Sequence, residues 1–195
     1  MTTTEPLPVY EQEVEGFGTV RLVRVDPERD AGLIHGWVAE ERARFWGMRE
    51  TTVEDVREIY AHLDSLTTHH AFLVYRDTTP VALFQTYEPE ADRVGECYEV
   101  RPGDIGVHLL LAPARTPERG FSAHLLTALT AFALTGKERI VAEPDAANDK
   151  AVALLARGGF VLGPEVVLPE IVLPEVHLAE KRARLAFLTR RHPTD

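Results

Sequence analysis

Residues 103–113 read GDIGVHLLLAP, and this run is the starting point for assigning the fold. The segment from Ile105 to Ala112 is short and apolar and is followed by proline, which predicts a buried strand. His108 lies in the middle of that segment. An imidazole there is either a core histidine satisfied by one hydrogen bond or a group that carries chemistry. The motifs elsewhere in the chain bear on that choice.

The composition indicates one globular domain covering residues 1–195. The chain has 195 residues, of which 45% are hydrophobic and 27% charged, a composition that supports a sizeable core. Its single cysteine, Cys97, cannot form an internal disulfide and predicts a reducing, cytoplasmic location. We expect either a monomer or a homodimer, because the apolar segment 166–170 and its echo at 171–175 could pair strands across an interface.

Charge and hydropathy argue against two classes of partner. The formal net charge is -10, which repels nucleic acid and anionic lipid, so we expect neither as a partner. No apolar run reaches the roughly 18 residues needed to span a bilayer. The N-terminus has neither a basic start nor an apolar stretch, so we do not expect it to be a signal peptide. A small molecule is the expected partner.

Hydrophobic periodicity predicts a mixed α/β order of elements. Strands are expected at 18–26, 70–76, 81–90, 105–112 and 139–144, with two or three more over 161–191. Helices are expected from about Pro27 to Glu41, over 51–66 with Thr52 as its cap, within 114–134 and over 148–160. Alternation of this kind is typical of a single α/β domain.

The loop ARTPERGFS, residues 114–122, leads into an apolar helix. Backbone N–H groups at a helix N-terminus converge on one place and attract an anion, and Gly120 allows close approach. Arg115 and Arg119 add local positive charge to an otherwise acidic protein. A diphosphate fits such a site, with Phe121 and Ser122 contributing their backbone amides, although most glycine-containing loops before a helix bind nothing.

The order of elements, together with ERGFSAHLL and NDKAVALLARGGF, resembles the GNAT acyl-CoA N-acyltransferase superfamily. The resemblance implies a mixed, mostly antiparallel sheet flanked by helices and acyl-CoA as co-substrate, acetyl-CoA or succinyl-CoA. It assigns the 114–122 loop to the CoA pyrophosphate and the helix opened by Asn148 and Ala151 to packing along the cofactor. It also implies that the backbone of Leu109, Leu110 and Leu111 binds the thioester arm.

Three positions depart from the superfamily pattern. Pro117 and Ser122 occupy places usually held by Gln or Arg and by Gly or Ala, so only Gly120 of that loop pattern is kept. Leu155 stands where many relatives carry a tyrosine that protonates the departing CoA sulfur. Since leucine has no proton to donate, water or another group must do so, or the thiolate leaves unprotonated.

A narrower resemblance rests on RFWGM, RPGDIGVHLLLAP and AEPDAAND. These segments are similar to siderophore-biosynthesis acyltransferases that act on lysine, Nε-hydroxylysine or N-hydroxylated diamines. The resemblance implies His108 and Asp145 as the catalytic pair, with His108 as general base. The implied reaction is direct acyl transfer in a ternary complex, with a hydroxamic acid as product.

Other residues receive weaker assignments. Trp46 could line the acceptor pocket or belong to the core, and Tyr87 and Glu88 could contact the acceptor amine or simply end a strand. His69 and His70 are adjacent, so on a strand they point to opposite faces, and we do not expect them to share a metal ion. We expect no metal site.

Two further functions stay open on the sequence. One is an acetyltransferase of another amine, such as an aminoglycoside or a protein N-terminus, for which acceptor competition is the discriminating test. The other is a CoA-binding module without catalysis, which is suggested by Leu155 and the altered loop. The sequence does not distinguish a diamine from an amino acid as acceptor.

Overall fold

The computed structural model describes residues 7–114, 116–172 and 177–191. They form two compact units. Unit 1 comprises the described residues up to Gln85 together with Leu109–His124, and unit 2 comprises Thr86–His108 together with the described residues from Leu125 onward. Three elements continue from one unit into the other, namely β4 (Thr79–Tyr87), β5 (Asp104–Leu111) and α3 (Phe121–Ala133). The expectation of one domain over residues 1–195 stays a prediction.

The strands of unit 1 are neighbours in chain order. β1 (Tyr10–Val14) pairs antiparallel with β2 (Gly18–Arg24), β2 pairs antiparallel with β3 (His69–Arg76), and β4 follows β3. Val20 and Leu22 of β2 are completely buried. This inward alternation is the reason the segment forms a strand with one face on a core.

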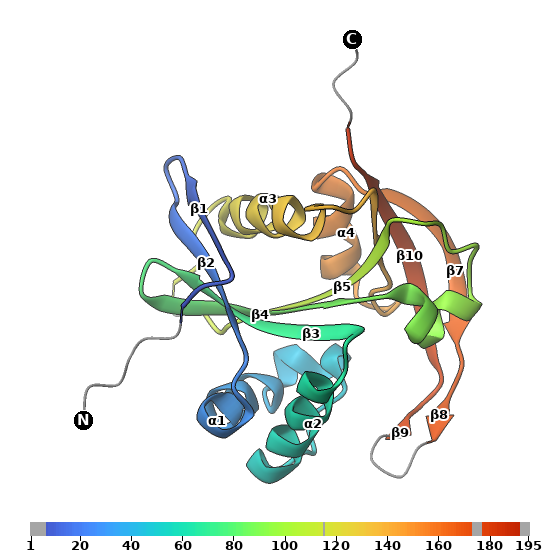
Figure 1. Ribbon diagram of the computed structural model, residues 1–195, viewed down its shortest axis with the longest axis horizontal. Helices are drawn as coiled ribbons and strands as arrows, with labels where there is room; N and C mark the ends of the chain where they lie inside the picture. Colours follow the sequence, from blue (N-terminus) through green and yellow to red (C-terminus); the bar gives the residue numbers. More distant parts are fainter. Residues whose placement is uncertain (1–6, 115, 173–176, 192–195) are drawn as a thin grey trace. The chain divides into compact units, whose positions relative to one another are not determined.

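Two helices cover the core of unit 1, and Figure 1 shows them side by side. They are α1 (Pro27–Val38) and α2 (Val53–Ser65), joined through a 3₁₀ helix, η1 (Glu41–Trp46). Thr52 caps α2 as expected, with Asp55 completing a capping box. Helix α1 is shorter than the predicted range ending at Glu41. Residues 41–46 instead form η1, where Arg42 donates a hydrogen bond of 2.6 Å to the carbonyl of Leu111 at the end of β5.

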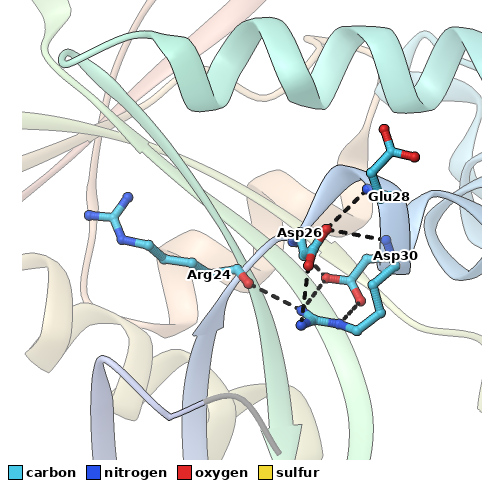
Figure 2. Close-up of polar contacts among 5 residues, drawn as sticks. Arg24, Asp26, Glu28 and Asp30 are labelled. Carbon is cyan, nitrogen blue, oxygen red and sulfur yellow. Dashed lines mark hydrogen bonds and ion pairs between the residues drawn. The ribbon is translucent and has the colours of Figure 1, made fainter. Parts of the chain in front are cut away.

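A compact carboxylate network starts α1 (Figure 2). The Asp26 carboxylate accepts hydrogen bonds from the backbone N–H groups of Glu28 and Arg29 at 3.1 and 3.3 Å. Asp30, with a side chain 5% exposed, receives two hydrogen bonds of 2.7 Å from the Arg29 guanidinium. The Asp26 backbone N–H also donates to Asp30 at 2.8 Å. Asp26 therefore supplies the cap that a helix N-terminus needs.

Unit 2 contains the parallel part of the sheet. Its strands follow the order β5, β6, β10, β7; β5 and β6 pair in parallel and the other neighbours pair antiparallel. The bounds of the remaining elements of this unit are η2 Pro89–Ala91, η3 Arg93–Glu96, β6 Arg139–Ala142, α4 Asp149–Arg157, β7 Val161–Leu168, β8 Ile171–Val172, β9 His177–Leu178 and β10 Lys181–Thr189. The mixed, mostly antiparallel sheet flanked by helices is confirmed.

The end of the chain differs from the expected two or three strands. Four strands are formed over the described part of residues 161–191, because β8 and β9 make a short hairpin separate from the main sheet. β10 is the longest of the four and lies between β6 and β7. None of the described helices is long and apolar enough to cross a membrane.

We expect Asp26→Ala to destabilise the protein by about 1 kcal/mol, because the substitution removes the cap from the first turn of α1. Urea unfolding followed by circular dichroism measures this change. Asp26→Asn is the matched control, since an amide oxygen can still accept both N–H groups. An Asp26→Ala protein as stable as the Asn variant would contradict the assignment of the cap.

Candidate functional site

A buried ion pair fixes the register of the strand that carries His108. Asp104 begins β5 and lies opposite Arg139, which begins β6. The Arg139 guanidinium donates two hydrogen bonds of 2.7 Å to the Asp104 carboxylate, a bidentate geometry that specifies one alignment. The same register places Gly106 opposite Val141. Since alternate residues of a strand share a face, His108 meets the residue two positions after Val141, which is Glu143.

Glu143 is the carboxylate that contacts the imidazole. Its side chain is 3% exposed, whereas that of His108 is 32% exposed. One Glu143 oxygen, Oε1, is bonded to His108 Nε2. The other oxygen, Oε2, accepts a hydrogen bond of 2.8 Å from the Tyr87 hydroxyl. The half-buried imidazole of His108 is thus hydrogen-bonded on its Nε2 side to the buried carboxylate of Glu143.

Tyr87 reaches Glu143 because Gly106 has no side chain. The Tyr87 ring lies over Gly106, where a Cβ would come within 2.1 Å of the ring carbons. The same ring lies 4.8 Å from the imidazole of His108, centroid to centroid. A glycine at this position is therefore required for the close approach of the aromatic ring to the backbone.

The electrostatics keep Glu143 ionised. Burial alone raises the pKa of its carboxyl, but the charge of a protonated His108 ring and the hydrogen bond from His108, with a smaller contribution from Lys181, lower that pKa below its ordinary value. When the His108 ring is neutral, the hydrogen bond and the Lys181 charge still favour the ionised carboxylate. Asp92 opposes this effect weakly. Burial and the neighbouring Glu143 charge raise the pKa of Tyr87 well above its ordinary value, so its hydroxyl stays a donor.

Asp145, expected as the partner of His108, makes a different contact. Its carboxylate accepts a hydrogen bond of 2.9 Å from the backbone N–H of Ala147, two residues along. Its backbone forms an isolated bridge with Ala183. The structure therefore gives Asp145 a local turn contact and places Glu143 against the ring. A catalytic role for Asp145 stays a prediction.

The Asn148 and Ala151 motif has a clear local role. Asn148 is the N-cap of α4, and its side-chain oxygen accepts a hydrogen bond of 3.2 Å from the Ala151 backbone N–H. Gly159 adopts a φ of 88°, in the left-handed region that ends a helix. The helix starts at its cap Asn148 as predicted but ends at Arg157, before the predicted limit of residue 160, and the contribution of these residues to CoA binding stays a prediction.

The loop before α3 has the predicted geometry in unit 1. Gly120 adopts a φ of 81°, and α3 begins at the next residue, Phe121. Arg119 is exposed, while Phe121 and Ser122 are half-buried in the first turn. A loop entering a helix in this way is suited to an anion. Arg115 lies outside the described residues.

Arg76 and Phe17 anchor the start of α3, and both were missed by sequence reasoning. Arg76 donates to the Phe17 carbonyl at 2.6 Å and forms an ion pair of 2.5 Å with Glu118 of the loop. Its guanidinium lies 4.2 Å from the centroid of the Phe17 ring, and Phe17 packs edge-on against Phe121 at 5.3 Å. These contacts stabilise the turn that precedes the helix.

The remaining candidates occupy varied environments. Trp46 ends η1 and packs, partly buried, against the core of unit 1, where Leu110 is also buried. Leu109 and Leu111 are half-buried, and Glu88 is exposed at the start of η2. Tyr87 is only 2% exposed, so its hydroxyl serves Glu143 rather than the surface. No group of three or more His, Cys, Asp or Glu suited to a metal ion occurs among the described residues.

Two curated proteins resemble the chain in sequence. The N(6)-hydroxylysine O-acetyltransferase of Escherichia coli is 26% identical over 77% of this chain. The match covers 48% of that relative, so the chain spans about half of the relative's length. The N-hydroxyputrescine acetyltransferase of Acinetobacter baumannii is 24% identical over 74% of this chain and 70% of its own length.

Solved structures share the fold. An uncharacterized protein from Bacillus halodurans superposes with a TM-score of 0.75 at 21% identity, covering 95% of this chain and 92% of its own. Aminoglycoside acetyltransferase AAC(6')-Ib in complex with coenzyme A superposes with a TM-score of 0.69 at 22% identity, covering 88% and 95%.

A family model settles the assignment. The model described as an acetyltransferase (GNAT) domain matches residues 26–168, which include His108, Glu143, the loop before α3 and the Asn148 cap. The chain therefore belongs to the GNAT acetyltransferase family.

Proposed function

We propose that this enzyme transfers an acyl group from acyl-CoA to the nitrogen of an N-hydroxylated diamine or of Nε-hydroxylysine, forming a hydroxamate for siderophore biosynthesis. The observation that carries the proposal is the accessible imidazole of His108, bonded to a buried carboxylate. The names of the two curated relatives, which concern hydroxylysine and N-hydroxyputrescine, support the choice of acceptor.

The chemistry of the acceptor suits a single histidine as base. An N-alkylhydroxylamine is less basic than an alkylamine, so more of it is neutral and nucleophilic near neutral pH. Its nitrogen forms a bond to the thioester carbonyl carbon while the carbon–sulfur bond breaks. His108 accepts the proton that the nitrogen loses as the amide forms, and the sulfur leaves as the CoA thiolate. No covalent enzyme intermediate is required, so we assign Cys97 no role.

The residues that would hold acyl-CoA fit that molecule chemically. In unit 1, left-handed Gly120 and the first turn of α3, with Phe121 and Ser122, offer backbone N–H groups to the diphosphate, and Arg119 adds a positive charge. The backbone of Leu109, Leu110 and Leu111 would bind the thioester arm. In unit 2, Asn148 and Ala151 would lie along the cofactor. Acetyl-CoA is the first donor to test and succinyl-CoA the second.

The location and the assembly are part of the same proposal. We place the reaction in the cytoplasm, where acyl-CoA is available and a lone cysteine such as Cys97 stays reduced. We expect a monomer or a homodimer acting on a small molecule, without nucleic acid or membrane as a partner.

An acceptor panel tests the function. The protein is incubated with acetyl-CoA and succinyl-CoA together with N-hydroxycadaverine, N-hydroxyputrescine, Nε-hydroxylysine, lysine, kanamycin and a peptide with a free N-terminal serine, and product masses are measured. We expect hydroxamate products to dominate. We expect His108→Gln to lower their rate by roughly 10²- to 10⁴-fold, because the general base is lost.

Three results would contradict the proposal. Preferred acylation of kanamycin or of the peptide would assign the enzyme to another amine. CoA binding without any product would indicate a binding module. A His108→Gln variant that folds normally and loses less than about threefold would return His108 to a structural role, since a true general base contributes far more.

A further inference from the structure

Both oxygens of the buried carboxylate are used by other side chains. Glu143 Oε1 is bonded to His108 Nε2, and Oε2 accepts the Tyr87 hydroxyl at 2.8 Å. The Glu143 side chain is only 3% exposed, and turning it toward solvent would break both hydrogen bonds. Burying a charge in this way is costly unless its partners remain in place. The carboxylate is therefore fixed in one orientation by its two neighbours.

An ionised carboxylate accepts hydrogen bonds and cannot donate them. The Glu143 contact therefore requires His108 to carry its proton on Nε2. In the neutral ring the other nitrogen, Nδ1, then has the lone pair that can accept a proton. The choice of tautomer thus follows from the charge of one buried residue.

Tyr87 supplies the second half of this arrangement. Its ring lies over Gly106, which has no side chain, and beside the imidazole of His108. Its hydroxyl donates a hydrogen bond to Glu143. Removing that hydroxyl leaves one oxygen of a buried carboxylate without its donor, which loosens the group that orients His108. The effect on the reaction is indirect, because Tyr87 is only 2% exposed.

We propose that Glu143 and Tyr87 are positioning residues for this acyl transfer: they fix His108 as the Nε2–H tautomer and so make Nδ1 the atom that takes the proton from the acceptor nitrogen. This inference rests on the proposed function of His108. It replaces the expected pairing of His108 with Asp145 by one with Glu143.

Steady-state kinetics with acetyl-CoA and N-hydroxycadaverine, followed by release of the CoA thiol, test the inference. We expect Glu143→Gln to lower kcat by about 10²-fold with little change in KM, because its amide can donate to Nε2 and so favour the tautomer protonated on Nδ1. Tyr87→Phe should lower kcat by about tenfold, since the carboxylate is retained but held by one bond. Glu143→Asp, which keeps the charge, should recover part of the loss.

Tyr98→Phe is the matched control. Tyr98 lies in the same unit, and its hydroxyl also donates to a buried carboxylate, that of Asp104, at 3.0 Å. We expect Tyr98→Phe to reduce stability about as much as Tyr87→Phe while leaving kcat unchanged, and thermal unfolding of both proteins measures this. Equal losses of kcat in the two variants would show that only stability is involved and would overturn the inference.

The inference and the proposed function fail differently. If His108→Gln retains activity, the proposed function falls and the positioning role falls with it. If His108→Gln abolishes activity but Glu143→Gln and Tyr87→Phe do not lower kcat, only the positioning role is wrong. A larger loss of kcat in Asp145→Asn than in Glu143→Gln would restore Asp145 as the partner of His108.

Discussion

A charged carboxylate that is almost completely removed from water is the constraint around which unit 2 is organised. Glu143 is 3% exposed and survives as an anion because His108 and Tyr87 bond to its two oxygens. Without these partners the cost of burying the charge would be several kcal/mol. In the proposed reaction the bond from Glu143 to His108 Nε2 also has a function, because it leaves Nδ1 as the ring nitrogen that can accept a proton.

The contacts that support this arrangement are distributed along the chain. The Asp104 and Arg139 pair sets the alignment of β5 with β6, and that alignment brings His108 to Glu143. Gly106 leaves space for the ring of Tyr87. Glu143 and Tyr87 are both buried, so they support His108 from the interior, as supporting residues commonly do where a functional group must be held precisely.

Local signals in the sequence predicted much of the fold. Thr52 and Asn148 were identified as helix starts, and both are caps in the structure. Glu143 was missed because contact with His108 depends on strand register, which is set by a salt bridge between residues 35 positions apart. Asp145 was expected instead because the resemblance to siderophore-biosynthesis acyltransferases implies it, whereas its carboxylate accepts a hydrogen bond from the Ala147 backbone N–H. An acidic residue ending an apolar strand, immediately before proline, was the available signal.

The protonation of the His108 ring tests the central claim most directly. Two-bond ¹H–¹⁵N correlation spectra of the uniformly ¹⁵N-labelled protein, recorded where the ring is neutral and assigned with His108→Gln, distinguish a protonated from an unprotonated ring nitrogen. The account predicts a proton on Nε2 and an unprotonated Nδ1. A His108 ring protonated on Nδ1, with Nε2 carrying the lone pair, would contradict it.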